Sequence, residues 1–464
     1  MTYQELIQIP MIKTMLPGPI ASRIIAQDEE YTSSSYTRFY PLVVRRGKGA
    51  IIEDVDGNLF LDFTSGIAVC STGHCHPRIV DAIKKQSELL LHMSGTDFYY
   101  APQADLAKKL ALLAPGTSPK KVFFANSGTE SVEAAFKLAR YHTKRKQIIS
   151  FFGGFHGRTM GSLSLTASKT IQRKGFDPLI PGVSHAPFGN CYRCPVNKNF
   201  GTCGIACVES IEKQLFRHTV SPDEVAAFIV EPIQGEGGYV VPPLEFHRDL
   251  KALAEKHGIL YIADEVQSGM GRTGKMFAIE HYGIEPDIIC LAKGIASGLP
   301  LGAMIAKAEI MDWPKGSHAS TFGGNPVACV AALETIALLE DGLMDNAQHV
   351  GEFLFELLLA LKDKHALIGD VRGKGLMLAI DLVKNRESKE PAGVERDAIV
   401  QACFKKGLLL LGCGLSGIRF CPPLIIKDHE AATAVRILDE VLSELKGYAN
   451  DQRVTGKIWY SSHS

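Results

Sequence analysis

The fold of this chain is decided by residues 259–301, ILYIADEVQSGMGRTGKMFAIEHYGIEPDIICLAKGIASGLPL. Two apolar runs in this stretch, residues 259–263 and 288–292, are typical of buried strands. Each run ends on one ionisable residue, Asp264 after the first and Lys293 after the second. Ligands of open α/β sheets bind beyond the carboxyl ends of the parallel strands. We therefore expect this acid and this amine to face one pocket.

The chemistry of a buried lysine gives this pair two interpretations. Removing an ammonium group from water lowers its pKa, and a lysine that is partly neutral is a nucleophile suited to Schiff-base chemistry. Alternatively, Asp264 caps a helix and Lys293 extends its charged end from a strand into water. The two residues by themselves do not decide between a reactive pair and a structural one.

The composition favours a globular enzyme over a nucleic-acid-binding or membrane protein. Hydrophobic residues make up 46% of the 464 residues and charged residues 22%, which suits a large core in two or three domains. Lysine and arginine together number 50, as do aspartate and glutamate, so no net field attracts nucleic acid or an anionic membrane. Apolar runs are shorter than a membrane span, and the N-terminal segment lacks signal-peptide features. The eleven cysteines do not form a secreted disulfide framework, and the expected location is the cytoplasm.

The order of predicted elements indicates an α/β protein with a smaller α+β unit. Strands alternate with helical patterns, which favours a mostly parallel sheet flanked by helices. The expected strands of this sheet are residues 122–125, 148–152, 226–230, 259–263, 288–292 and 302–305. Apolar alternation around Asp56-Gly57 predicts a hairpin over residues 49–63. We divide the chain into an N-terminal arm and hairpin that belong to the small domain (residues 1–75), a large domain (76–330) and a C-terminal small domain (331–464).

A candidate phosphate site follows the first of these strands. Ser127-Gly128-Thr129 lies between the strand and the start of a helix, where backbone N–H groups, hydroxyls and the helix dipole favour an anion. The alternative is ordinary helix capping, with Ser127 as the N-cap and Glu130 as its capping-box partner.

A second motif, Phe155-His156-Gly157-Arg158, follows the strand at residues 148–152. Its aromatic pair suits stacking on a planar cofactor, and its arginine suits bidentate binding of a carboxylate. The alternative is a surface loop with a solvated arginine.

Two further segments carry polar residues on glycine-rich turns. Glu231 and Glu236 flank one such turn, where they form an acid/base pair or hold an arginine. Thr321 adds a hydroxyl shortly before a helix whose N-terminus favours an anion.

Four cysteines form a separate pattern outside these motifs. Cys191, Cys194, Cys203 and Cys207 have the spacing CxxC followed by CxxxC, which is compatible with tetrahedral zinc. The alternatives are a disulfide or four reduced, inert thiols. No other metal site is predicted.

Together these residues resemble the class III (omega-amino acid) aminotransferases, which use pyridoxal 5′-phosphate (PLP). The resemblance extends from about residue 41 to residue 442, and its most specific part is the motif ADEVQSGMGRTG followed by LAKG. It implies the type I fold of PLP-dependent transferases. Among members of the family, the chain is most similar to 4-aminobutyrate aminotransferases.

The resemblance implies a role for each motif in a cofactor site. Lys293 would hold PLP covalently and later carry a proton, while Asp264 would pair with the pyridinium nitrogen and keep the ring electron-poor. The other cofactor contacts would come from Ser127, Gly128, Thr129, Phe155, His156, Gln267 and Thr321 of the partner subunit.

Substrate contacts are implied in the same way. Arg158 would bind the distal carboxylate, with Ile67 and Glu231 lining the pocket. Glu236 would pair with Arg419 while 4-aminobutyrate is bound and would release that arginine to the α-carboxylate of glutamate. The implied reaction transfers the amino group of 4-aminobutyrate to 2-oxoglutarate, giving succinate semialdehyde and glutamate.

Three alternatives stay open. An acetylornithine/ornithine-type aminotransferase is the first, because Arg158 and Ile67 also fit acetylornithine aminotransferases. Isoleucine in place of tyrosine at position 67 argues against ornithine δ-aminotransferase itself, and residues 411–423 are more similar to the 4-aminobutyrate group. Some archaeal relatives with a similar cysteine insertion are amino-acid racemases, and these tend to carry aspartate where this chain has Glu236. A non-catalytic scaffold on the same fold would lack Lys293, which is present.

The resemblance also implies partners. Amino acids and 2-oxo acids are the expected small molecules. A homodimer with shared active sites is expected, and the sequence leaves open whether dimers pair into tetramers.

Overall fold

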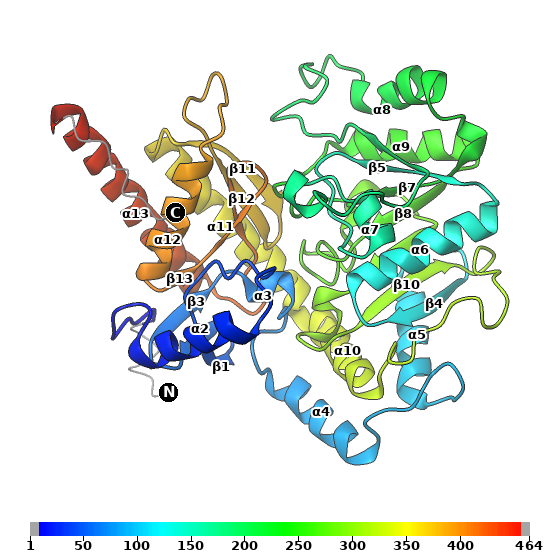
Figure 1. Ribbon diagram of the computed structural model, residues 1–464, viewed down its shortest axis with the longest axis horizontal. Helices are drawn as coiled ribbons and strands as arrows, with labels where there is room; N and C mark the ends of the chain where they lie inside the picture. Colours follow the sequence, from blue (N-terminus) through cyan, green and yellow to red (C-terminus); the bar gives the residue numbers. More distant parts are fainter. Residues whose placement is uncertain (1–8, 456–464) are drawn as a thin grey trace.

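The computed structural model describes the backbone of residues 9–455 and the side chains of residues 9–445. The outer ends of the first and last predicted domains, residues 1–8 and 456–464, lie outside the described residues. A seven-stranded sheet lies on one side of the molecule and two four-stranded sheets lie on the other (Figure 1).

The seven-stranded sheet has the strand order β4-β10-β9-β8-β7-β5-β6. Its strands are β4 (Lys120–Ala125), β5 (Gln147–Phe151), β6 (Val183–Ala186), β7 (Val225–Val230), β8 (Leu260–Asp264), β9 (Ile288–Leu291) and β10 (Gly302–Lys307). Only β10 among them runs antiparallel to its neighbours, so the prediction of a mostly parallel sheet is confirmed. Strand β6 is absent from the predicted strands, because its sequence VSHA is short and has no clear apolar pattern.

Helices cover both faces of this sheet because successive strand residues point to opposite sides. In β9, Ile288 belongs to the apolar cluster that contains α6 (Gly128–Thr143), whereas Ile289 belongs to the cluster that contains α9 (Leu244–His257). Burial on both faces explains why these strands are apolar runs without alternation. The other helices of this part of the molecule are α4 (Pro77–Leu89), α5 (Ala101–Leu113), α7 (Met160–Leu165), α8 (Ala206–Ser210) and α10 (Pro326–Leu338).

The smaller part of the molecule combines the beginning and the end of the chain. Its first sheet has the order β1-β2-β3-β13 and its second the order β11-β12-β15-β14. The predicted hairpin is present as β2 and β3, and β3 pairs with β13 in parallel. The strands are β1 (Val44–Lys48), β2 (Ile51–Asp54), β3 (Leu59–Asp62), β11 (Ile368–Lys374), β12 (Met377–Leu382), β13 (Leu408–Leu409), β14 (Leu411–Cys413) and β15 (Gly417–Phe420). The domain boundaries at residues 75 and 330 stay predictions.

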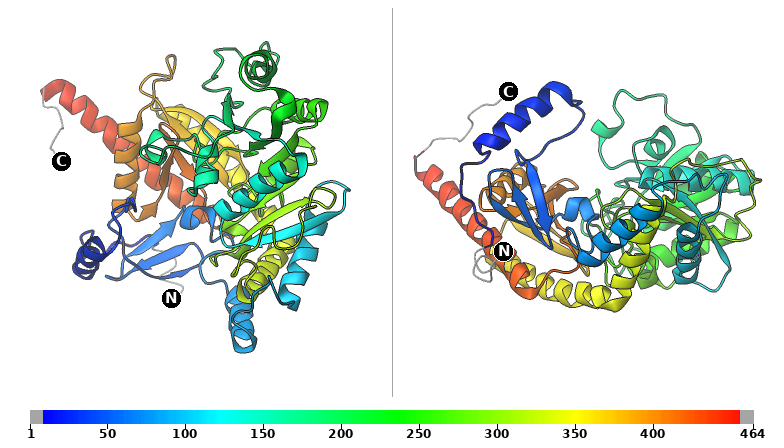
Figure 2. Two further views of the ribbon diagram at one scale, coloured as in Figure 1. Left: turned by 45° about the vertical axis from the view of Figure 1, so that its right-hand side comes forward. Right: turned by 90° about the horizontal axis from the view of Figure 1, so that it is seen from below.

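Helices connect and cover this smaller part. Helix α10 and the following α11 run from the seven-stranded sheet toward the smaller part (Figure 2). The helices of the smaller part are α2 (Pro19–Tyr31), the short α3 (Ser65–Ala68), α11 (Met344–Lys364), α12 (Gly393–Lys405) and α13 (Asp428–Thr455).

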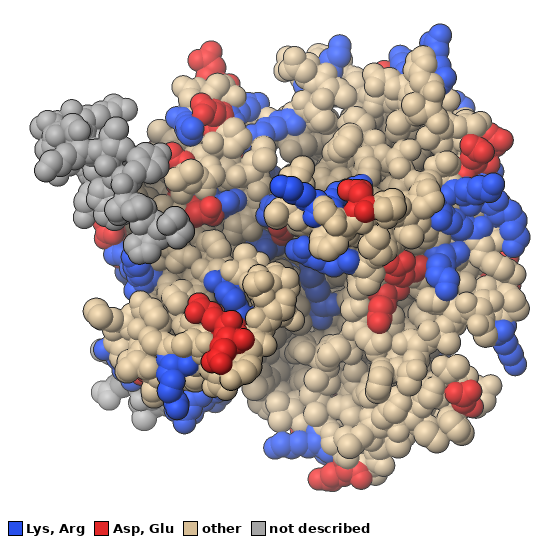
Figure 3. All heavy atoms as spheres, viewed as in Figure 1, with Lys and Arg blue, Asp and Glu red and all other residues tan. Residues whose placement is uncertain are grey.

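The surface carries mixed charge. On the face drawn in Figure 3, lysine and arginine side chains are interspersed with aspartate and glutamate side chains, in line with the balanced composition. Within the described part of the chain, no helix combines the length and the apolar character needed to cross a membrane.

Candidate active site

A cavity of about 420 Å³ gathers residues that follow the carboxyl ends of five strands of the large sheet. These strands are β4, β5, β7, β8 and β9. The predicted site residues that line it are Ser127, Gly128, Thr129, Phe155, His156, Arg158, Glu231, Asp264, Gln267 and Lys293. Asp264 and Lys293 therefore face one pocket, as the two strand ends predict.

Lys293 has an unusual backbone and an unusual pKa. Its φ of 45° lies in the left-handed region, which costs a residue other than glycine about 1–3 kcal/mol. The packing around Lys293 must therefore stabilise this conformation. Burial, helped by the positive charge of Arg419, lowers the pKa of its amine to about 8, while Glu231 and Asp264 partly oppose both effects. About a tenth of the amine is consequently neutral and nucleophilic at pH 7, a far larger fraction than for an ordinary lysine.

Asp264 is buried and held in place by two hydrogen bonds. His156 Nδ1 donates to its Oδ2 over 2.7 Å, and the N–H of Val266 donates to its Oδ1 over 3.1 Å. Burial lowers the pKa of His156, but the hydrogen bond to Asp264 and the negative charges of Asp264 and Glu231 together outweigh burial and raise the pKa. His156 is thus a partner of Asp264, a contact that the sequence did not indicate.

The start of α6 faces the cavity. Ser127 Oγ accepts a hydrogen bond from the N–H of Glu130 over 3.4 Å, and Glu130 Oε2 accepts one from the N–H of Asn126 over 2.6 Å. The N-capping interpretation of Ser127 is therefore confirmed. Capping does not exclude the anion site, because Asn126 and Gly128 line the cavity at the positive end of a 16-residue helix.

Two residues near Asp264 complete this side of the cavity. Gln267 Oε1 is buried and has no hydrogen-bond partner among the described side chains and backbone. A Cβ atom at Gly235 would lie only 2.7 Å from Gln267 Nε2, so the glycine makes room for this amide. Val266 also lines the cavity and was not among the predicted residues. Its position two residues beyond Asp264, directly after the end of β8, was the available signal.

Glu231 lines the cavity but holds backbone groups. Its Oε1 accepts from the N–H of Phe155 over 2.9 Å, and its Oε2 accepts from the N–H of Gly235 over 2.8 Å. Burial raises the pKa of Glu231 to about 7, an effect that His156 partly opposes. The carboxyl group therefore ties two active-site loops together.

Two arginines differ in their surroundings. Arg158 is exposed on the cavity wall and forms no ion pair with an acidic side chain of the described residues. Arg419 is 5% exposed, and its Nη1 lies 3.4 Å from Glu236 Oε2. Neither Arg419 nor Glu236 lines the cavity, yet the charge of Arg419 acts on Lys293.

Two predicted site residues lie away from the cavity of their own chain. Ile67 is 45% exposed and does not line it, whereas Val69 from the same loop does. Thr321 is exposed and follows Ser320, which lines a different cavity. The single chain therefore does not place Ile67 at this cavity, and its role in shaping the pocket stays a prediction.

The four cysteines of residues 191–207 surround a small cavity of about 20 Å³. All four thiols are free, and burial raises the pKa of Cys207 to about 11, so this thiol is protonated at neutral pH. The described residues contain no group of three or more histidine, cysteine, aspartate or glutamate side chains placed to hold a metal ion. The disulfide is absent from this structure, and the zinc interpretation has no support in it.

Comparisons with other sequences agree with this site. The profile of the family described as aminotransferase class-III matches residues 31–442. The chain is 39% identical to an alanine/serine racemase of Pyrococcus horikoshii, over 98% of this chain and 95% of that protein. It is 40% identical to a 4-aminobutyrate aminotransferase of Mycobacterium leprae, over 94% and 99% of the two chains. It is 41% identical to an acetylornithine aminotransferase of Methanopyrus kandleri, over 89% and 97%.

Solved structures show the same architecture. An aminotransferase of Bacillus anthracis superposes with a TM-score of 0.85 at 33% identity, covering 92% of this chain and 99% of that chain. An amine transaminase from an uncultivated Pseudomonas species, in its PLP-bound form, superposes with a TM-score of 0.82 at 32% identity, covering 89% and 98%. With its type I fold, its site at the strand ends and these matches over most of its length, the chain belongs to the class III aminotransferase family.

Proposed function

We propose that this protein is a transaminase that transfers the amino group of an omega-amino acid, above all 4-aminobutyrate, to 2-oxoglutarate. The products are succinate semialdehyde and glutamate. The observation that carries the proposal is the contact between buried Arg419 and Glu236 beside the cavity. 4-Aminobutyrate has no α-carboxylate, whereas 2-oxoglutarate has one. The side chain of Glu236 can pair with Arg419 for the first substrate and leave the arginine for the second.

The cofactor is pyridoxal 5′-phosphate, and the side chains of the cavity fit it. The N-terminus of α6 suits the phosphate, and the carboxylate of Asp264 suits a protonated ring nitrogen. Gln267 Oε1 is buried and has no hydrogen-bond partner among the residues that the structure describes, so it can accept a hydrogen bond from a ligand. The hydroxyl group on the PLP ring would supply that hydrogen bond. The amine of Lys293 suits the aldehyde. When bound, PLP supplies an electron sink for the carbon that carries the amine.

The residues of the chain then divide the work of the reaction. Arg158 binds the distal carboxylate and orients the substrate. Lys293, with its pKa near 8, removes the proton from the substrate carbon that bears the amine and returns it later. Asp264, fixed by His156, keeps its negative charge beside the ring nitrogen. Because amine donor and acceptor use one site in turn, the kinetics are ping-pong.

Substrate tests separate this function from its two competitors. With 4-aminobutyrate and 2-oxoglutarate, the purified PLP-loaded protein should form succinate semialdehyde and glutamate in equal amounts, and omitting the 2-oxo acid should stop turnover. Racemisation is the second candidate, favoured by the 98% coverage of the match to the Pyrococcus racemase. Interconversion of L- and D-alanine without any 2-oxo acid, and no semialdehyde, would replace the first proposal. Faster turnover of acetylornithine than of 4-aminobutyrate would reassign the donor.

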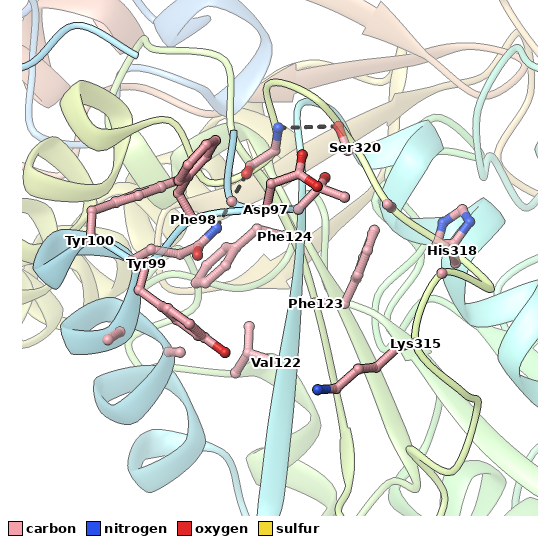
Figure 4. A pocket seen from close by; sticks show the side chains of 18 of the residues that line it. Asp97, Phe98, Tyr99, Tyr100, Val122, Phe123, Phe124, Lys315, His318 and Ser320 are labelled. Carbon is pink, nitrogen blue, oxygen red and sulfur yellow. Dashed lines mark hydrogen bonds between the residues drawn. The ribbon is translucent and has the colours of Figure 1, made fainter. Parts of the chain in front are cut away.

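We also propose a homodimer with shared sites. A second cavity of about 740 Å³ lies between the start of α5, strand β4 and the loop of residues 315–323 (Figure 4). Large apolar side chains are exposed there, including Phe98 at 51%, Tyr99 at 102% and Phe322 at 61%. Exposed apolar patches of this kind mark protein interfaces. Thr321 belongs to the same loop, so a second copy on this face would receive its hydroxyl.

Mixing two inactive variants tests the shared site. Lys293→Ala and Thr321→Ala are each expected to be impaired alone, the second most clearly at low PLP concentration. If Thr321 serves the partner's site, each mixed dimer has one fully intact site. Random exchange makes about half of the dimers mixed, so about a quarter of wild-type activity should return. Activity that stays at the level of the two separate variants, or a monomer by light scattering, would contradict the shared site.

A further inference from the structure

Glu236 contacts two cations, and the two contacts differ in kind. Lys169 Nζ lies 2.6 Å from Glu236 Oε1, the distance of a charge-assisted hydrogen bond. Arg419 Nη1 lies 3.4 Å from Oε2, and this nitrogen makes no hydrogen bond within the described residues. Glu236 is therefore held mainly by the lysine, although it sits beside the arginine.

Arg419 is left with free donors in a buried place. Its side chain is 6% exposed, and both Nε and Nη1 lack a hydrogen-bond partner in the described part of the chain. Buried donors without partners are costly, so such a group binds an incoming carboxylate strongly. Lys169 is 40% exposed on the loop that follows α7, and the glutamate between the two is 20% exposed.

We propose that Lys169 is a positioning residue that holds Glu236 away from Arg419 and so prepares the arginine for an α-carboxylate. The inference rests on the proposed function, in which Arg419 binds the α-carboxylate of glutamate and 2-oxoglutarate. When a substrate α-carboxylate takes the place of Glu236 at Arg419, Glu236 keeps its ion pair with Lys169 and does not become an unpaired carboxylate. Lys169 thereby favours dicarboxylates over substrates that carry one carboxylate.

Binding of two unreactive acids to the PLP-loaded protein tests this inference by calorimetry. Glutarate can engage Arg158 and Arg419 together, whereas butyrate has only one carboxylate. In Lys169→Gln, Glu236 is expected to close on Arg419, so the Kd of glutarate should rise about threefold to fivefold, the upper part of the range of a partly exposed ion pair. The Kd of butyrate should stay within about twofold. The KM for 2-oxoglutarate should rise with the Kd of glutarate, with kcat of the 4-aminobutyrate half-reaction unchanged.

Three further variants make the result specific. Lys169→Arg keeps the positive charge and should restore glutarate binding. Lys174→Gln removes an exposed lysine of the same loop that has no ion pair among the described side chains, and it should change neither constant. In an Arg419→Ala background, Lys169→Gln should have no further effect on glutarate, because the two residues act through one carboxylate.

Other outcomes would overturn the inference. An unchanged Kd of glutarate in Lys169→Gln, an equal rise for butyrate, or no recovery in Lys169→Arg would each do so. Failure of the proposed function is a separate result, seen when wild-type protein makes no succinate semialdehyde from 4-aminobutyrate. The comparison of glutarate with butyrate reports on Lys169 and Arg419 even in that case, because it needs no turnover.

Discussion

Lys293→Ala is expected to lower kcat for amino transfer by about 10⁴-fold or more. The change removes both the nucleophile that attaches the cofactor and the base that moves the substrate proton, and a positioned base alone contributes about 10²- to 10⁴-fold. Steady-state turnover with 4-aminobutyrate and 2-oxoglutarate measures the loss. The visible absorbance of the lysine-bound cofactor should give way to that of the free aldehyde.

A matched control comes from the same stretch of chain. Lys275 is exposed, and Lys275→Ala should leave both turnover and absorbance as in the wild type. A Lys293→Ala protein that keeps the wild-type absorbance would refute the assignment of this lysine.

The pKa of Lys293 adds a pH dependence to this expectation. Burial and the charge of Arg419 lower the pKa of the free amine to about 8, and only the neutral amine attacks an aldehyde. Covalent uptake of PLP by the cofactor-free protein should therefore accelerate as the pH rises through about 8 and level off above it. Stopped-flow absorbance across this range measures the midpoint. A rate that keeps rising beyond about pH 10, the usual range of a lysine pKa, would show an ordinary lysine.

Asp264→Asn is expected to lower kcat by about 10²- to 10³-fold, the usual cost of removing one electrostatic contact from a reacting centre. Asparagine keeps the shape and an acceptor for His156 Nδ1 but loses the charge that keeps a ring nitrogen protonated. The pKa of His156 should fall as well, because the variant removes the charge of the Asp264 carboxylate and its charge-assisted hydrogen bond, which together help to raise that pKa. An NMR titration of the imidazole measures that shift.

Two checks keep this second prediction specific. Asp264→Glu retains the charge and should recover part of the activity, and both variants should unfold at temperatures close to that of the wild type. Full activity in Asp264→Asn would show that the ring nitrogen does not depend on this carboxylate.

Local sequence was enough to identify the cavity and most of its lining. Strands that are buried on both faces are apolar runs. A polar residue that ends such a run lies at the carboxyl edge of the sheet, where ligands of parallel sheets bind. Asp264 and Lys293 can therefore be paired from their positions in the sequence, and the turn at Ser127 can be placed at a helix start. The family resemblance added the cofactor through the same residues.

Contacts between distant loops required the tertiary structure. His156 and Asp264 are 108 residues apart, and Lys169 and Glu236 are 67 residues apart. No periodicity or spacing encodes which of many charged side chains meet, because that choice depends on how separate loops pack against each other.

Exposure was the other quantity that the sequence did not determine. The family resemblance implies that Ile67 lines the pocket, yet in the single chain this residue has a left-handed φ of 67° and is 45% exposed. Sequence by itself determined the parallel α/β sheet and the acid and amine at its edge, since burial selects residue types strand by strand. Only the tertiary structure decided that His156 holds Asp264 and that Glu236 lies nearer to Lys169 than to Arg419. These contacts join loops that are far apart in the sequence, so they depend on how the loops pack and how deeply each charge is buried.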